Sequence, residues 1–149
     1  VVESSIKGGF VRYEITPAAK QEYKDYALTF LMEYDSMAEA FARDNIRSND
    51  TAVVNQIVSD YVNADAQFAM NIFMAMLPAY EKAPVLIESL PFPLRIIAAD
   101  YTPVDESALK KYCRHGYTIR WISNSGHFPM VEQPEQFLAA LRRMLAASK

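Results

Sequence analysis

The segment from Ser125 to Pro134, with the sequence Ser-Gly-His-Phe-Pro-Met-Val-Glu-Gln-Pro, carries the side chain best suited to acid–base chemistry. It places His127 between a predicted strand and the last predicted helix. Histidine is the side chain whose unperturbed pKa lies near neutrality, so a histidine on a strand-end loop can accept and return protons. The chain has only two histidines. His127 is therefore the first candidate for a catalytic residue.

Two strands and two helices are predicted around this histidine. Leu94–Ala99 is a short apolar run typical of a buried strand, and Tyr117–Ile122 is β-branched and aromatic. Residues 107–113 predict a short helix between them, and Pro134 opens a final helix. The residues expected to face inward from that helix are Phe137, Leu138, Leu141, Met144 and Leu145. The order strand, helix, strand, helix implies a parallel pair with a crossover, so the predicted fold class is α/β.

The first part of the chain, from residue 17 to about residue 90, is helical in pattern. Thr16 can cap a helix and Pro17 fits its first position, and the apolar spacing that follows predicts one amphipathic helix as far as Phe41. Asn49-Asp50 predicts the start of a second helix. Residues 63–65 predict a break before a third, which Pro78 is expected to end, with residues 85–90 forming one more short turn.

Composition excludes several classes of protein. The 149 residues have a formal net charge of −3 and scattered basic side chains, which argues against nucleic acid and anionic membranes as partners. No apolar run approaches the roughly 20 residues of a membrane span. Four glycines form no phosphate-binding loop, and Cys113 with His115 is too small a set for a metal site, so no cofactor or metal is predicted. A single cysteine agrees with a reducing compartment, and a cytoplasmic location is expected.

The layout from Leu94 to Leu145 resembles the end of the α/β-hydrolase fold. In that family the penultimate strand leads to a loop that often carries the catalytic acid, and the last strand leads to a loop with the catalytic histidine. The corresponding segments are residues 94–103 and residues 126–137, where Gly-His and apolar residues precede Glu-x-Pro-Glu-x-Phe. The helices before Pro91 resemble the cap that many of these enzymes insert.

The resemblance implies a partial fold in three parts: residues 1–10 as the end of a core strand and a linker, residues 11–90 as a helical cap, and residues 91–149 as the carboxyl-terminal part of the core. The family's nucleophile lies on a Gly-x-Ser-x-Gly elbow, and no such motif occurs here. We therefore expect a fragment or a processed chain that needs a complementary N-terminal half or a second chain.

The resemblance also implies roles for particular residues. His127 would be the general base, and its acid partner would be Asp100, after the penultimate strand, or Glu3, after the presumed sixth strand; Asp100 is favoured. The substrate would be ester-like or otherwise small and apolar. A pocket for it is expected from a group of apolar side chains, because methionine adapts to irregular ligands. These are Phe73, Met74, Met76, Leu77 and Phe128.

A second hypothesis comes from another class of protein. The helical part could be a non-catalytic binding or interaction module whose apolar groove holds a partner helix or a lipid. A Gly-x-Ser-x-Gly elbow upstream of Val1 in the reading frame would favour the enzyme.

Overall fold

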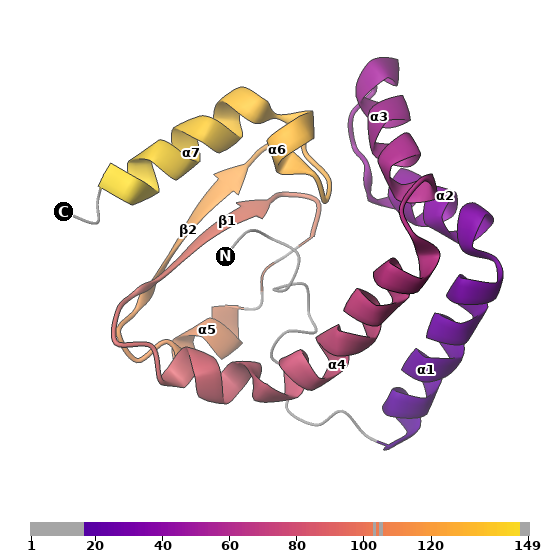
Figure 1. The fold of residues 1–149 in the computed structure, drawn as a ribbon. Helices are drawn as coiled ribbons and strands as arrows, with labels where there is room; N and C mark the ends of the chain where they lie inside the picture. Colours follow the sequence, from indigo (N-terminus) through magenta and orange to yellow (C-terminus); the bar gives the residue numbers. More distant parts are fainter. Residues whose placement is uncertain (1–16, 103, 105, 147–149) are drawn as a thin grey trace.

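The computed structural model describes residues 17–102, 104 and 106–146, without the side chains of Ala19, Leu77 and Tyr80. Within these residues the fold is mixed α/β, mostly helical, with one two-stranded parallel sheet (Figure 1). The predicted strand end at residues 1–3 lies outside the described residues. The elements in chain order are α1 (Pro17–Met32), α2 (Tyr34–Asn45), α3 (Thr51–Val62), α4 (Ala66–Glu88), β1 (Leu94–Ala99), α5 (Glu106–Tyr112), β2 (Tyr117–Ile122), α6 (Pro129–Glu132) and α7 (Pro134–Ala146).

The two predicted strands form and pair in parallel, as expected from the crossover through α5. Leu94 lies opposite Tyr117 and Ala99 opposite Ile122, with no bulge between. Strand alternation divides the apolar side chains of β1 between two cores. On one face Ile96 packs with Leu109 of α5. On the other, Ile97 packs with residues of α7, so β1 is buried on both faces.

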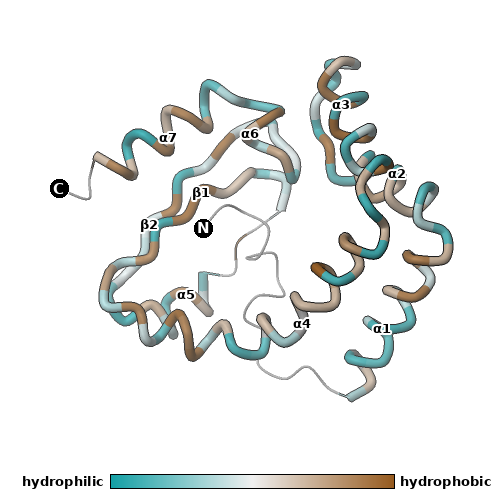
Figure 2. The backbone as a smooth tube through the Cα atoms, viewed as in Figure 1, coloured by the Kyte–Doolittle hydropathy of each residue, from teal (hydrophilic) through white to brown (hydrophobic). Residues whose placement is uncertain are grey.

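Helix α7 begins at Pro134 as predicted, but its buried face differs from the expected one. Hydrophobic and hydrophilic residues alternate along it (Figure 2). The side chains that contact the β1 and β2 core are Phe137, Ala140, Leu141 and Met144. Leu138 and Leu145 are 47% and 63% exposed, so their predicted inward orientation is wrong. The residues that do face the core lie three and four positions apart, and these two lie one position off that stripe.

The helical part is divided differently from the expectation. The predicted single helix as far as Phe41 is interrupted at Glu33, whose φ of −118° and ψ of 37° separate α1 from α2. Conversely, α4 continues through Pro78 and Pro84 and ends only at Glu88. Each proline removes one helical hydrogen bond and crowds the preceding turn. The helix curves along its length in Figure 1, as prolines inside a helix commonly produce.

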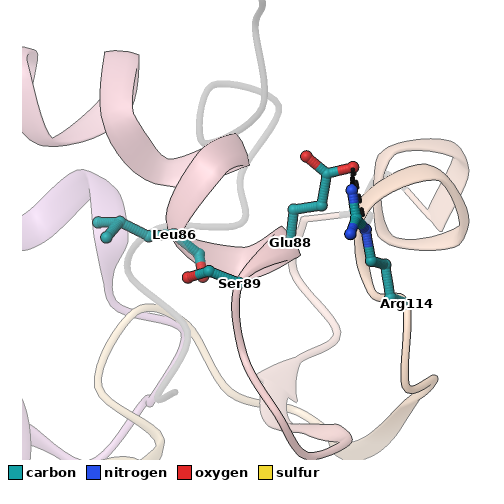
Figure 3. A network of polar contacts seen from close by, with 4 residues as sticks. All are labelled: Leu86, Glu88, Ser89 and Arg114. Atoms are coloured by element: carbon teal, nitrogen blue, oxygen red, sulfur yellow. Dashed lines mark hydrogen bonds and ion pairs between the residues drawn. The ribbon is translucent and has the colours of Figure 1, made fainter.

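The predicted helix starts at the other two breaks are confirmed. The Asp50 carboxylate accepts the backbone N–H of Ala52 at the start of α3, and the Asp65 carboxylate accepts that of Phe68 at the start of α4. The end of α4 is tied to the turn after α5 by an ion pair of Glu88 with Arg114, 2.7 Å between Oε1 and Nη2 (Figure 3). Both partners are solvent-accessible, so this pair adds little to stability.

Helices α2 and α3 share a small core that also includes the loop after β2. Ala42, Ile46 and Ile57 are its buried members, and Phe128 and Val131 pack against them. The Tyr34 hydroxyl donates to the Tyr61 carbonyl across the helix pair at 3.0 Å. The helical part therefore packs directly on the segment that carries His127. No helix among the described residues is both long and apolar enough to cross a membrane.

Tyr61 is expected to make the chain less stable in alkali. Burial raises the pKa of its phenol, and the nearby Tyr34 adds to the rise. The folded chain then keeps this proton after the unfolded chain begins to lose it, at about pH 10. The free energy of unfolding is therefore unaffected by this group below that pH and falls above it. Urea unfolding at increasing pH should show a shallower fall for Tyr61→Phe. Equal slopes in the parent and in Tyr61→Phe would contradict the prediction.

Candidate functional site

His127 lies on the loop between β2 and α6, next to the carboxyl end of β1. The loop leaves the sheet at Ser123, and Asn124 turns it with a φ of 55°, a left-handed conformation that asparagine tolerates. Gln136 of α7 holds Ser123 by accepting its N–H at 3.1 Å and donating to its carbonyl at 3.3 Å. The sequence prediction that places this histidine on a strand-end loop is confirmed.

The His127 ring is hydrogen-bonded to a residue that sequence reasoning did not single out. Its Nδ1 lies 3.0 Å from the hydroxyl oxygen of Tyr101, which follows β1. The rings of Phe41 and Phe128 meet the imidazole edge-on, with centroids 6.4 and 5.2 Å away. A hydroxyl and two aromatic rings from three different parts of the chain thus fix the orientation of a half-buried imidazole.

Asp100 lies at the carboxyl end of β1, as predicted, but the hydrogen bonds of its carboxylate go to the backbone of the loop after β2. Its Oδ2 accepts the N–H of Asn124 at 3.0 Å and its Oδ1 that of Ser125 at 3.4 Å. These are backbone contacts two and three residues before His127. Glu3, the alternative acid, lies outside the described residues. The role of either carboxylate as the partner of His127 stays a prediction.

The carboxylate of Glu132 accepts four backbone hydrogen bonds around the histidine loop, and the sequence had indicated no role for this residue. The residue is only 7% exposed. Oε1 accepts the N–H groups of Gly126 and Phe128, at 3.0 and 3.2 Å. Oε2 accepts those of Arg47 and Ser48, at 2.7 and 2.9 Å. One carboxylate therefore joins both sides of His127 to the connection between α2 and α3.

Gly126 allows this junction to close. A Cβ atom at Gly126 would lie 2.1 Å from the Asn45 carbonyl oxygen and 3.0 Å from the Arg47 nitrogen, both backbone atoms. The same Asn45 carbonyl accepts the N–H of His127 at 2.8 Å. The backbone conformation of Gly126 is not left-handed, so it is the absence of a side chain that matters here.

The predicted apolar pocket residues fall in two places, which aromatic contacts connect. Phe73 of α4 stacks on Phe30 at a centroid distance of 6.4 Å, Phe30 meets Phe41 at 6.5 Å, and Phe41 meets His127. Phe128 packs on Tyr61 at 5.5 Å. Met74 and Met76 are half-buried on α4, and the Leu77 side chain lies outside the described part of the chain. A continuous series of rings therefore leads from the predicted pocket to the histidine.

The second histidine and the cysteine do not join this site. Cys113 packs against the core formed by β1 and α5, where burial raises the pKa of its thiol. His115 is exposed in the turn before β2. In the part of the chain that the structure describes, no three His, Cys, Asp or Glu side chains gather so that they could hold a metal ion.

Neither a scan of protein-family models nor a search of the curated proteins finds a match to this chain.

Tyr101 and Glu132 are the two residues of this candidate site that the sequence pattern did not identify. A weak signal existed for both. Tyr101 directly follows Asp100 at the end of a predicted strand, and residues that come just after parallel strands meet at one edge of the sheet. Glu132 is an acidic residue directly after the apolar trio Pro129-Met130-Val131, and an acid that is buried among apolar residues is usually paired.

Proposed function

We propose that this chain supplies the cap and the carboxyl-terminal core of an α/β-hydrolase, and that His127 is its general base. The substrate is ester-like and apolar, and a Ser or Asp nucleophile comes from residues outside this chain or from a second chain. We also propose a cytoplasmic location, because a single cysteine agrees with a reducing compartment.

The observation that carries the proposal is the position of His127. It sits on the loop at the carboxyl end of β2, beside the carboxyl end of the parallel neighbour β1. In open α/β sheets, ligands bind at this edge. A core shared with α2 and α3 covers the loop, as a cap over a site would. The imidazole is only half-buried, which leaves part of it accessible to a reacting group.

The chemistry follows from what such an imidazole can do. A neutral histidine removes the proton of an attacking hydroxyl and later delivers it to the leaving group. With an Asp nucleophile it would instead activate the water that releases the covalent intermediate. The aromatic rings that run from Phe73 to His127 offer apolar contact to the organic part of an ester.

The test uses the protein as encoded, including any residues that precede Val1. We expect it to hydrolyse a p-nitrophenyl ester, and we expect His127→Gln to lower kcat by roughly 10³-fold or more, because loss of a triad member removes most of the chemical acceleration. The matched control is His115→Gln, which changes the other, exposed histidine and should leave kcat unchanged.

The result also decides between the two classes of function. A reading frame without a Gly-x-Ser-x-Gly or equivalent nucleophile elbow, or an esterase activity that survives His127→Gln, would reject the enzyme. The alternative, a non-catalytic helical module that binds a partner helix or a lipid through an apolar groove, would then replace it.

A further inference from the structure

Tyr101 and His127 come together at the ends of the two strands, although 26 residues separate them. Tyr101 leaves the sheet two residues after the last pair of the β1–β2 register, and its ring meets the imidazole edge-on with centroids 6.5 Å apart. The phenol reaches Nδ1, the nitrogen that a catalytic acid contacts in a Ser-His-Asp triad. The guanidinium carbon of Arg47 lies 6.0 Å from the Tyr101 ring centroid, on the other side of the junction with the helices.

We infer that Tyr101 is a positioning residue for His127: its hydroxyl oxygen accepts a hydrogen bond from Nδ1–H and favours the tautomer in which Nε2 carries no proton. The choice of tautomer rests on the proposed function, because a general base needs an unprotonated Nε2. The positioning itself rests on the contact.

A phenol can do this because its oxygen has acceptor capacity as well as a donor. In neutral imidazole, the hydrogen bond at one nitrogen determines which nitrogen carries the proton. A neutral phenol is a weaker acceptor than a carboxylate, since charge-assisted hydrogen bonds are about twice as strong. Asp100, the residue before Tyr101, has a carboxylate, but this group accepts hydrogen bonds from the backbone N–H groups of Asn124 and Ser125. The phenol therefore orients the ring, and Asp100 stabilises the loop under it.

The test is long-range ¹H–¹⁵N NMR of the imidazoles at about pH 8, where an ordinary histidine is neutral. Only two histidines contribute signals, and the exposed His115 serves as an internal reference. We expect His127 in the parent to show two well-separated nitrogen signals with the proton on Nδ1. In Tyr101→Phe the two signals should move toward each other as both tautomers become populated. Tyr117→Phe is the matched control, since it removes a phenol whose hydroxyl donates to Glu106 instead.

A second readout uses the esterase activity of the encoded protein. Tyr101→Phe should lower kcat by about tenfold, the effect of losing one orienting hydrogen bond, and leave KM unchanged. A parent with the proton on Nε2, or nitrogen signals that Tyr101→Phe leaves in place, would overturn the inference even if His127→Gln abolishes activity. If Tyr101→Phe moves the signals but His127→Gln keeps full activity, the positioning holds and the proposed function fails.

Discussion

Gly126→Ala is expected to lower the free energy of unfolding by about 4 kcal/mol, a large share of the stability of a typical domain. The new methyl group would lie 2.1 Å from the Asn45 carbonyl oxygen. Backbone atoms cannot rotate aside as a flexible side chain can, so the loop and the end of α2 must separate. That separation also weakens the hydrogen bonds of His127 to Asn45 and of Gly126 to Glu132.

A second glycine distinguishes this steric effect from the ordinary cost of replacing glycine. Gly116 has a φ of +83° and nothing within 4 Å of the position of its missing Cβ. Gly116→Ala should therefore cost only about 1–2 kcal/mol, the strain of a left-handed alanine. Urea unfolding followed by circular dichroism measures both variants. Equal losses in the two proteins would mean that the close approach of Gly126 to Asn45 does not contribute as described.

Glu132→Ala is also expected to lower the free energy of unfolding by about 4 kcal/mol, here because hydrogen bonds to a charged group are lost. The carboxylate accepts four backbone N–H groups, from Arg47, Ser48, Gly126 and Phe128. Removing it leaves these donors without their acceptor in a largely buried place, and each unsatisfied buried donor costs about 1–3 kcal/mol, less where water can enter. Chemical denaturation again gives the magnitude.

Two further substitutions make this prediction specific to the carboxylate. Glu132→Gln keeps the shape and one acceptor oxygen but turns an NH₂ group toward N–H donors. Its free energy of unfolding should therefore be lower than that of the parent and higher than that of Glu132→Ala. Glu135→Ala removes an exposed acid three residues away in the first turn of α7 and should change stability by less than about 1 kcal/mol. Any other order of the three variants would contradict the role assigned to Glu132.

The strands and the histidine loop could be predicted because their signals are local. The apolar run Leu94–Ala99 and the β-branched run Tyr117–Ile122 have the composition of strands, and the helix between them leaves room only for a parallel pairing. Asp50 and Asp65 cap helices through contacts within three residues. Such features depend on neighbours in the sequence, which the sequence itself displays.

The features that were wrong or missed depend on distant contacts. Pro78 and Pro84 are ordinary helix breakers, yet α4 passes through both, and tertiary packing can override such a preference. The hydrogen bond from Arg47 to Glu132 joins residues 85 positions apart, and no periodicity encodes it. Tyr101 and His127 likewise meet only because β1 and β2 end side by side.

The short connection between α2 and α3 has a further consequence for how this protein can vary. Surface connections of this length usually accept extra residues, because little depends on their backbone. Here Asn45, Arg47 and Ser48 each bind the histidine loop or its carboxylate through a main-chain atom. Other side chains can supply the same main-chain atoms, except proline at positions 47 and 48, which would remove an N–H donor, but an added residue would move these atoms out of position. Insertions should therefore be excluded from this connection even where its side chains are free to change.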